Sequence, residues 1–159
     1  AVRIAPLCHH RQHLDELART HVQAFGALLP EWTLEQARDE LATHVAPNAI
    51  PNTWLALDGA DWLGSVSLLA EDDPRLAAYT PWLASLYVRP AARARGVGAA
   101  LVRHCVAAAA ALGVARLHLY CEPARVPYYA RLGWTRLDHL PLGALQVVVM
   151  TIEPGSPHV

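Results

Sequence analysis

The segment LYVRPAARARGVGAAL, residues 86–101, limits what this 159-residue chain can fold into more than any other stretch. An apolar run typical of a strand leads through arginines and small residues to Gly96 and Gly98, and an alanine-rich helix comes next. Backbone N–H groups and the dipole at a helix N-terminus bind anions, and glycines let the backbone approach a phosphate closely. The segment therefore predicts a phosphate cradle in a domain that contains both strands and helices.

Two nucleotide-binding motifs are disfavoured by the residues after the glycines. A P-loop needs a lysine and a serine or threonine there, whereas alanines come after Gly98. A Rossmann turn needs a third small residue for close helix–strand packing, and Leu101 occupies that position. Two interpretations remain: an Arg93-x-x-Gly96-x-Gly98 anion site, in which arginines supply the charge, or a solvent-exposed connection with incidental glycines.

Composition narrows the class of protein further. The hydrophobic fraction of 53% and the net charge of −1 predict one compact domain and no nucleic-acid partner, because nucleic-acid binders carry excess positive charge. Three cysteines without CxxC spacing disfavour disulfides and a zinc site, and no apolar run is long enough to span a membrane. We therefore expect a cytoplasmic protein without a membrane partner or a bound metal.

Hydrophobic periodicity predicts an irregular alternation of helices and strands, which is typical of a mixed α+β domain. A capping-box pattern at Thr33 and Gln36 predicts the start of a second helix, and Asp58-Gly59 predicts the turn of a hairpin. Strict alternation along residues 82–88 would place Trp82, Ala84, Leu86 and Val88 on one face. The remaining expected elements are a strand at 2–5, a helix at 14–25, a helix at 98–112 and later strands beginning with RLHLYC and ending with LQVVVMTI.

A longer stretch carries a family resemblance. WLASLYVRPAARARGVGAALVRHCVAAAAALGVARLHLYC, followed by YYARLGW, resembles the GNAT superfamily of acyl-CoA-dependent N-acetyltransferases over about Trp82 to Asp138. The resemblance implies a single GNAT-type domain over residues 1–153, with 154–159 as a C-terminal tail. It also implies a twisted mixed sheet of six to seven strands flanked by about four helices. A splayed pair of strands would form the cleft for coenzyme A.

The resemblance implies acetyl-CoA as the cosubstrate. In the family the pyrophosphate lies on the glycine turn and the pantetheine arm pairs with the preceding strand, where a backbone N–H polarises the thioester carbonyl. Glu122 stands where many members have a cofactor-contacting asparagine; it could instead serve the acceptor or pair with Arg125. The cofactor-binding residues implied here are Leu86, Tyr87, Val88, Arg93, Ala94, Arg95, Gly96, Val97, Gly98, Ala99 and Glu122.

Tyr129 matches the family tyrosine four residues before Gly133, and the resemblance implies that it protonates the departing thiolate of coenzyme A. Tyr128 occupies the preceding aromatic position. Without the resemblance, both tyrosines are better explained as amphipathic core residues. Cys105 and Cys121 lie in a predicted core helix and strand, so we expect direct attack by the acceptor in a ternary complex, without a covalent acyl-enzyme.

The acceptor side is less defined by the sequence. An acceptor amine must lose a proton before it attacks, and the candidate bases are Glu71, Asp72, Asp73, His118 and a water held by Ser85. Trp32 and Trp82 flank the expected acceptor side, and its carboxylates favour a cationic acceptor.

The leading hypothesis is thus acetyl transfer from acetyl-CoA to a primary amine, either a small molecule or a peptide N-terminus, and a homodimer is compatible with it. The alternative is a catalytically silent CoA-binding or sensor module of the same fold.

Overall fold

A mixed sheet of seven strands forms the centre of the fold in the described residues, which are 2–26, 31–72 and 74–155 of this computed structural model. Its spatial order is β1-β2-β3-β4-β5-β7-β6, and every neighbouring pair is antiparallel except β4 and β5. The strands are β1 (Arg3–Pro6), β2 (Asn52–Asp58), β3 (Asp61–Leu69), β4 (Trp82–Val88), β5 (Leu117–Cys121), β6 (Thr135–Leu142) and β7 (Leu145–Ile152).

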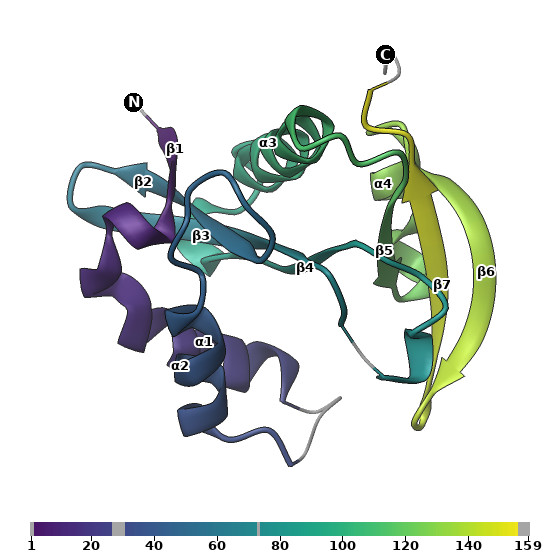
Figure 1. Cartoon of the computed structure of the whole chain (residues 1–159), viewed down its shortest axis with the longest axis horizontal. Coiled ribbons are helices and arrows are strands. Elements are labelled where there is room, and N and C mark those ends of the chain that lie inside the picture. The colour runs from purple at the N-terminus through teal and green to yellow at the C-terminus, as the bar shows by residue number, and fades with distance from the viewer. Residues whose placement is uncertain (1, 27–30, 73, 156–159) are drawn as a thin grey trace.

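Helices cover both faces of this sheet (Figure 1). They are α1 (Leu14–Phe25), α2 (Leu34–Ala42), α3 (Val97–Ala111) and α4 (Val126–Ala130). In Figure 1, α1 and α2 lie below strands β2–β4 and α3 lies above them, while β5, β7 and β6 form the right-hand part of the molecule. The predicted α+β class, with up to seven strands and about four helices, is confirmed.

Several local signals set the helix and strand boundaries. The capping box at the start of α2 is present, since Thr33 Oγ1 accepts from the Gln36 amide and the Gln36 side chain accepts from the Thr33 amide. The hairpin of β2 and β3 is also present, but Gly59 and Ala60 form its turn, not Asp58-Gly59. Small shifts affect two other elements: the first strand covers residues 3–6, and the helix after the glycines covers 97–111.

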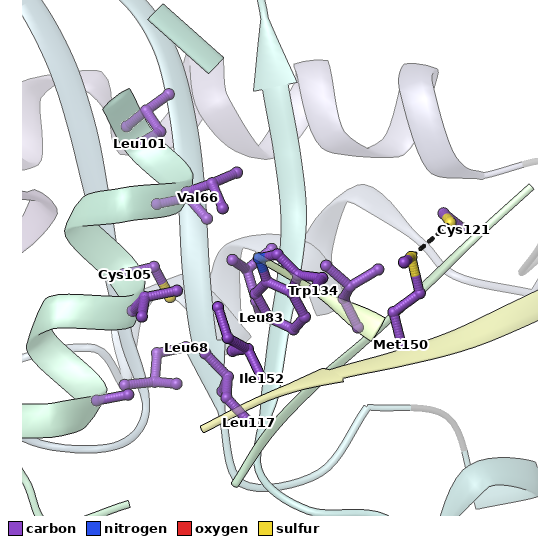
Figure 2. Packing of buried hydrophobic residues seen from close by; sticks show 14 of the residues in the cluster. Val66, Leu68, Leu83, Leu101, Cys105, Leu117, Cys121, Trp134, Met150 and Ile152 are labelled. Atoms are coloured by element: carbon purple, nitrogen blue, oxygen red, sulfur yellow. Dashed lines mark hydrogen bonds between the residues drawn. The ribbon is translucent and has the colours of Figure 1, made fainter. Parts of the chain in front are cut away.

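Three clusters of buried side chains hold the layers together. The largest lies between α3 and the sheet and continues to β5 and β7; Figure 2 shows Leu101 and Cys105 of α3 facing this interior, with Trp134 and Met150 beyond. A second cluster joins α1 and α2 to β1–β3, and a third joins the start of β4 to β6 and β7. The two halves of the sheet are therefore packed separately on the faces away from α3.

Strands β4 and β5 diverge after a single pair of residues in register. Within these two strands, the register pairs only Trp82 with His118, and the His118 amide donates to the Pro81 carbonyl at 3.0 Å. Tyr79 and Trp82 stack around the His118 ring, with centroid distances of 5.4 and 5.7 Å, and close this end. The backbone of β4 beyond Leu83 is thus left open toward β5, as expected for a splayed pair.

The predicted alternation along β4 is wrong because the strand contains a β-bulge. Between the pairs Ser67–Ala84 and Ser65–Tyr87, β3 advances by two residues and β4 by three. Ser85 takes up the extra residue with a positive φ of 53°. Leu86 consequently packs with Leu83 on the α3 side instead of sharing a face with Trp82.

Candidate active site

A cavity of about 1200 Å³ occupies the opening between β4 and β5 and continues under α1 and α2. One end is lined by the glycine turn, the middle by the bulge of β4 and by α4, and the other end by α2 and the segment after β3. We call this cavity the cleft. Of the site residues singled out from the sequence, the following line the cleft: Trp32, Glu71, Asp72, Ser85, Leu86, Val88, Arg93, Ala94, Gly96, Val97, Gly98, Ala99, Glu122, Tyr128 and Tyr129.

The glycine turn places the N-terminus of α3 at one end of the cleft. Ala94 and Gly96 have φ values of 62° and 77°, which turn the chain sharply before the helix. The amides of the first helical turn have no intrahelical acceptor, so they are available to an anion. Arg93 Nε donates to the Val88 carbonyl at 2.9 Å and ties the turn to the end of β4.

Gly98 lies where an added side chain would fill the cleft. A Cβ atom built there would be 3.0 Å from Tyr128 Oη and 3.4 Å from Val88 Cγ2. The backbone of α3 thus carries no side chain at this point, and the Tyr128 hydroxyl lies directly against it. This bare helix end suits a bulky anion such as a pyrophosphate.

Tyr129 lines the middle of the cleft from α4. Its ring contacts Tyr128 at 5.1 Å and Trp134 at 6.4 Å between centroids, which fixes the hydroxyl in a largely apolar environment. Desolvation raises the pKa of Tyr129 well above its usual value. The phenol therefore keeps its proton at neutral pH.

Four of the predicted residues lie elsewhere. Tyr87 faces α1 and packs against Trp62 at 6.3 Å, and Arg95 is exposed outside the cleft lining. Trp82 is buried in the third core cluster, and His118 lies beside it, with Nδ1 3.2 Å from the Pro81 carbonyl oxygen. Another candidate base, Asp73, lies outside the described residues.

The cleft also contains a set of buried polar side chains that sequence reasoning missed. Ser65 and Ser67 alternate with Val66 and Leu68 along β3, so both serines face α1 and α2 while the apolar pair faces α3. A histidine lies behind each serine: His21 Nε2 is 3.0 Å from Ser65 Oγ, and His44 reaches Ser67 through a threonine. The alternating serines in an otherwise apolar strand were the available sequence signal.

Both histidines are uncharged at neutral pH. Desolvation lowers the pKa of each ring to about 4; the neighbouring His44 adds a smaller effect on His21. His21 and His44 line the cleft with exposed fractions of only 2% and 4%. They therefore present neutral nitrogen atoms, not positive charges, to whatever enters this end.

Carboxylates line the outer part of the same end. Asp39 and Glu40 come from α2, and Glu71 and Asp72 come from the segment after β3. Desolvation and the charge of Asp72 raise the pKa of Glu40, against the effect of a hydrogen bond from Trp32. The field at this end favours a positively charged ligand.

Burial makes the two interior thiols poor nucleophiles. Desolvation raises the pKa of Cys105 far above that of a free thiol and raises the pKa of Cys121 to about 11. Within the described ranges, no three side chains of His, Cys, Asp or Glu gather as a metal site, and no helix is long and apolar enough to cross a bilayer.

Comparisons with known proteins agree with this architecture. The family model described as "Acetyltransferase (GNAT) family" matches residues 14–134. No curated protein matches the chain. A GNAT-family acetyltransferase from Streptococcus pneumoniae shares 19% identity, with a TM-score of 0.68 over 96% of this chain and 98% of that one.

Two further solved structures are named for their acceptors. A chimera of spermidine N-acetyltransferase SpeG from Vibrio cholerae and hSSAT has 14% identity and a TM-score of 0.71, covering 96% of this chain and 95% of that one. An aminoglycoside 6'-N-acetyltransferase complexed with coenzyme A has 14% identity and a TM-score of 0.68, covering 89% and 90%. The fold is that of an acyltransferase. The chain belongs to the GNAT acetyltransferase family, whose members use acetyl-CoA.

Proposed function

We propose that the protein transfers an acetyl group from acetyl-CoA to a primary amine by direct attack in a ternary complex. The observation that carries this proposal is the continuity of the cleft, which joins the bare N-terminus of α3, the hydroxyl of Tyr129 and the carboxylate-lined end in one cavity of about 1200 Å³. A donor and an acceptor can therefore meet without leaving the protein.

The residues at the donor end fit coenzyme A. The amides of Val97, Gly98 and Ala99 would hold the pyrophosphate, with Arg93 adding positive charge. The backbone of Leu86 and Val88, on the edge of β4 that is open toward β5, would pair with the pantetheine arm. When bound, acetyl-CoA supplies a thioester whose C–S bond breaks as the C–N bond to the acceptor forms.

Tyr129 is proposed as the acid that protonates the departing sulfur. Its position in the cleft supports this role, because a phenol that is protonated at neutral pH can hydrogen-bond to the sulfur as negative charge develops there. The buried, weakly acidic thiols of Cys105 and Cys121 support direct transfer over a covalent acyl-enzyme. The carboxylates at the far end support an acceptor that arrives as a cation.

An acceptor screen tests the proposal. Acetyl-CoA binding is first measured by calorimetry, and free-thiol release is then followed with panels of primary amines, including polyamines and aminoglycosides, and of peptides with free N-termini. We expect binding and faster thiol release with at least one amine. Binding without transfer to any amine would instead support a silent CoA-binding module, and absence of binding would overturn both.

A further inference from the structure

Three hydroxyl and imidazole groups form a continuous hydrogen-bonded line into the cleft. Thr53 of β2 and Ser67 of β3 are direct cross-strand partners, and their hydroxyl oxygens are 2.7 Å apart. His44, which comes just after α2, has Nδ1 2.8 Å from Thr53 Oγ1. Ser67 and His44 line the cleft, and the exposed fractions of all three residues are 4% or less.

The position of this line relates it to the reacting atoms. Ser67 pairs with Ala84 of β4, the residue immediately before the bulge at Ser85. The cleft under the bulge is where the donor and acceptor ends meet. Burying three polar side chains without a function is costly, because each must be kept hydrogen-bonded.

The hydrogen-bond inventory gives the line a direction. Each hydroxyl carries one proton, and a neutral imidazole has one donor and one acceptor nitrogen. If Nδ1 of His44 accepts from Thr53, then Thr53 accepts from Ser67, and the lone pairs of Ser67 Oγ are left for a donor in the cleft. An amine or ammonium nitrogen is such a donor.

We propose that Ser67, backed by Thr53 and His44, receives the proton that an ammonium acceptor must lose before it attacks; this inference rests on the proposed function. The acceptor nitrogen gives one proton to Ser67 Oγ, the Ser67 proton passes to Thr53 Oγ1, and the Thr53 proton passes to His44 Nδ1. His44 then releases its Nε2 proton to water. Ser67 is the catalytic residue, and Thr53 and His44 are positioning residues.

The remaining bonds and protons balance. The neutral amine forms the C–N bond while the C–S bond breaks, and its second proton leaves to water. The sulfur takes the proton of Tyr129, which water restores. One proton is released for each ammonium acetylated.

The neutral state of His44 supports this assignment. The charged and titratable groups at its end of the cleft are His21 from α1, Asp39 and Glu40 from α2, and Glu71 and Asp72 from the segment after β3. Desolvation nevertheless dominates and keeps the pKa of His44 low, so the ring is neutral throughout the neutral range; because it gives its Nε2 proton to water as it takes one at Nδ1, it does not have to hold a positive charge.

Thr53→Val tests the relay because it removes the hydroxyl while preserving the branched shape. We expect kcat at pH 7 to fall about 10²-fold, the usual scale for general base catalysis, with acetyl-CoA affinity unchanged. The wild-type kcat/KM should be level between pH 5 and the acceptor pKa. In Thr53→Val it should rise about tenfold per pH unit, because only pre-deprotonated amine reacts, and approach the wild-type value at high pH.

Thr151→Val is the matched control. Thr151 is also buried, and its hydroxyl donates to the Leu117 carbonyl at 3.0 Å, away from the cleft lining. This variant should keep the level profile. If Thr53→Val does not fold, as judged by thermal melting and acetyl-CoA calorimetry, Ser67→Ala decides the question by the same pH profile.

The outcomes separate the two proposals. Wild-type turnover with a level profile in both Thr53→Val and Ser67→Ala overturns the relay and leaves the proposed function intact. A wild-type protein that binds acetyl-CoA but acetylates no amine overturns the proposed function and the relay together.

Discussion

The proposed donor and acceptor ends of the cleft are built in different ways. The donor end comes largely from one continuous segment, residues 85–99, in which the bulge, the turn and the start of α3 succeed each other along the chain. The acceptor end is assembled from α1, α2, β3 and the segment after β3. A contiguous site can be recognised as a motif, whereas a dispersed site exists only after the layers have packed.

The two ends also differ in polarity. The donor end offers backbone amides, an arginine and the positive end of the α3 dipole. The acceptor end offers carboxylates around a floor of neutral histidines and hydroxyls. This division suits an anionic donor that enters from one side and a cationic acceptor that enters from the other.

The tyrosine pair between the two ends gives the largest expected effect. Tyr129→Phe should lower kcat about 10²-fold and leave acetyl-CoA affinity unchanged, because it removes the acid but not the binding surface. Tyr128→Phe is the matched control at the neighbouring residue. The Tyr128 hydroxyl lies at Gly98, so we expect its loss to affect acetyl-CoA affinity and to leave kcat almost unchanged. Steady-state kinetics and calorimetry on both variants make the comparison, and equal kcat values in the two would contradict it.

Sequence reasoning identified most of the residues that line the proposed donor end because their signals are local. The glycines and the later tyrosine motif predicted the turn and Tyr129 as neighbours of one cleft, and both line it. It failed at the bulge, because strict alternation carries no sign of one extra residue at Ser85. It also missed Ser67 and His44, whose proximity depends on the pairing of β2 with β3 and on the packing of α2.

The two buried histidines at the acceptor end should make the stability of the fold sensitive to acid. His21 and His44 bind protons near pH 6.5 when unfolded but only near pH 4 when folded, so stability falls as the pH drops from about 6.5 toward 4. At pH 5 each should cost about 2 kcal/mol of unfolding free energy relative to pH 7. Urea unfolding at both pH values measures this, and His44→Gln should reduce the loss by about that amount.

His21→Gln provides the companion measurement. His21→Gln should reduce the loss of unfolding free energy between pH 7 and pH 5 by a similar amount. Other partly buried histidines should leave some pH dependence of the unfolding free energy in both variants. If the unfolding free energy depends on pH in the same way in the wild type and in both variants, burial does not hold His21 and His44 neutral.

The contact between Gly98 and the Tyr128 hydroxyl predicts a smaller effect on acetyl-CoA affinity, in which substitutions at the two residues are coupled. Gly98→Ala places Cβ against Tyr128 Oη and Val88 Cγ2, so we expect acetyl-CoA affinity to fall by roughly three- to tenfold, about 1 kcal/mol. Adding Tyr128→Phe removes the nearer atom and should recover part of the loss. Strictly additive losses in the calorimetric cycle would contradict this contact.

The smallest effect concerns the turn itself and has a matched pair in the chain. Gly96 and Gly113 have φ values of 77° and 78°, and a Cβ at either would meet nothing within 4 Å. Gly96→Ala and Gly113→Ala should therefore each cost about 1 kcal/mol of stability through left-handed strain alone. Gly96 precedes α3 at the donor end, whereas Gly113 lies just beyond the other end of that helix. Only Gly96→Ala should also weaken acetyl-CoA binding, by a few-fold, because strain there displaces the amides of the cradle. Equal affinities in the two variants would place the anion site elsewhere on the molecule.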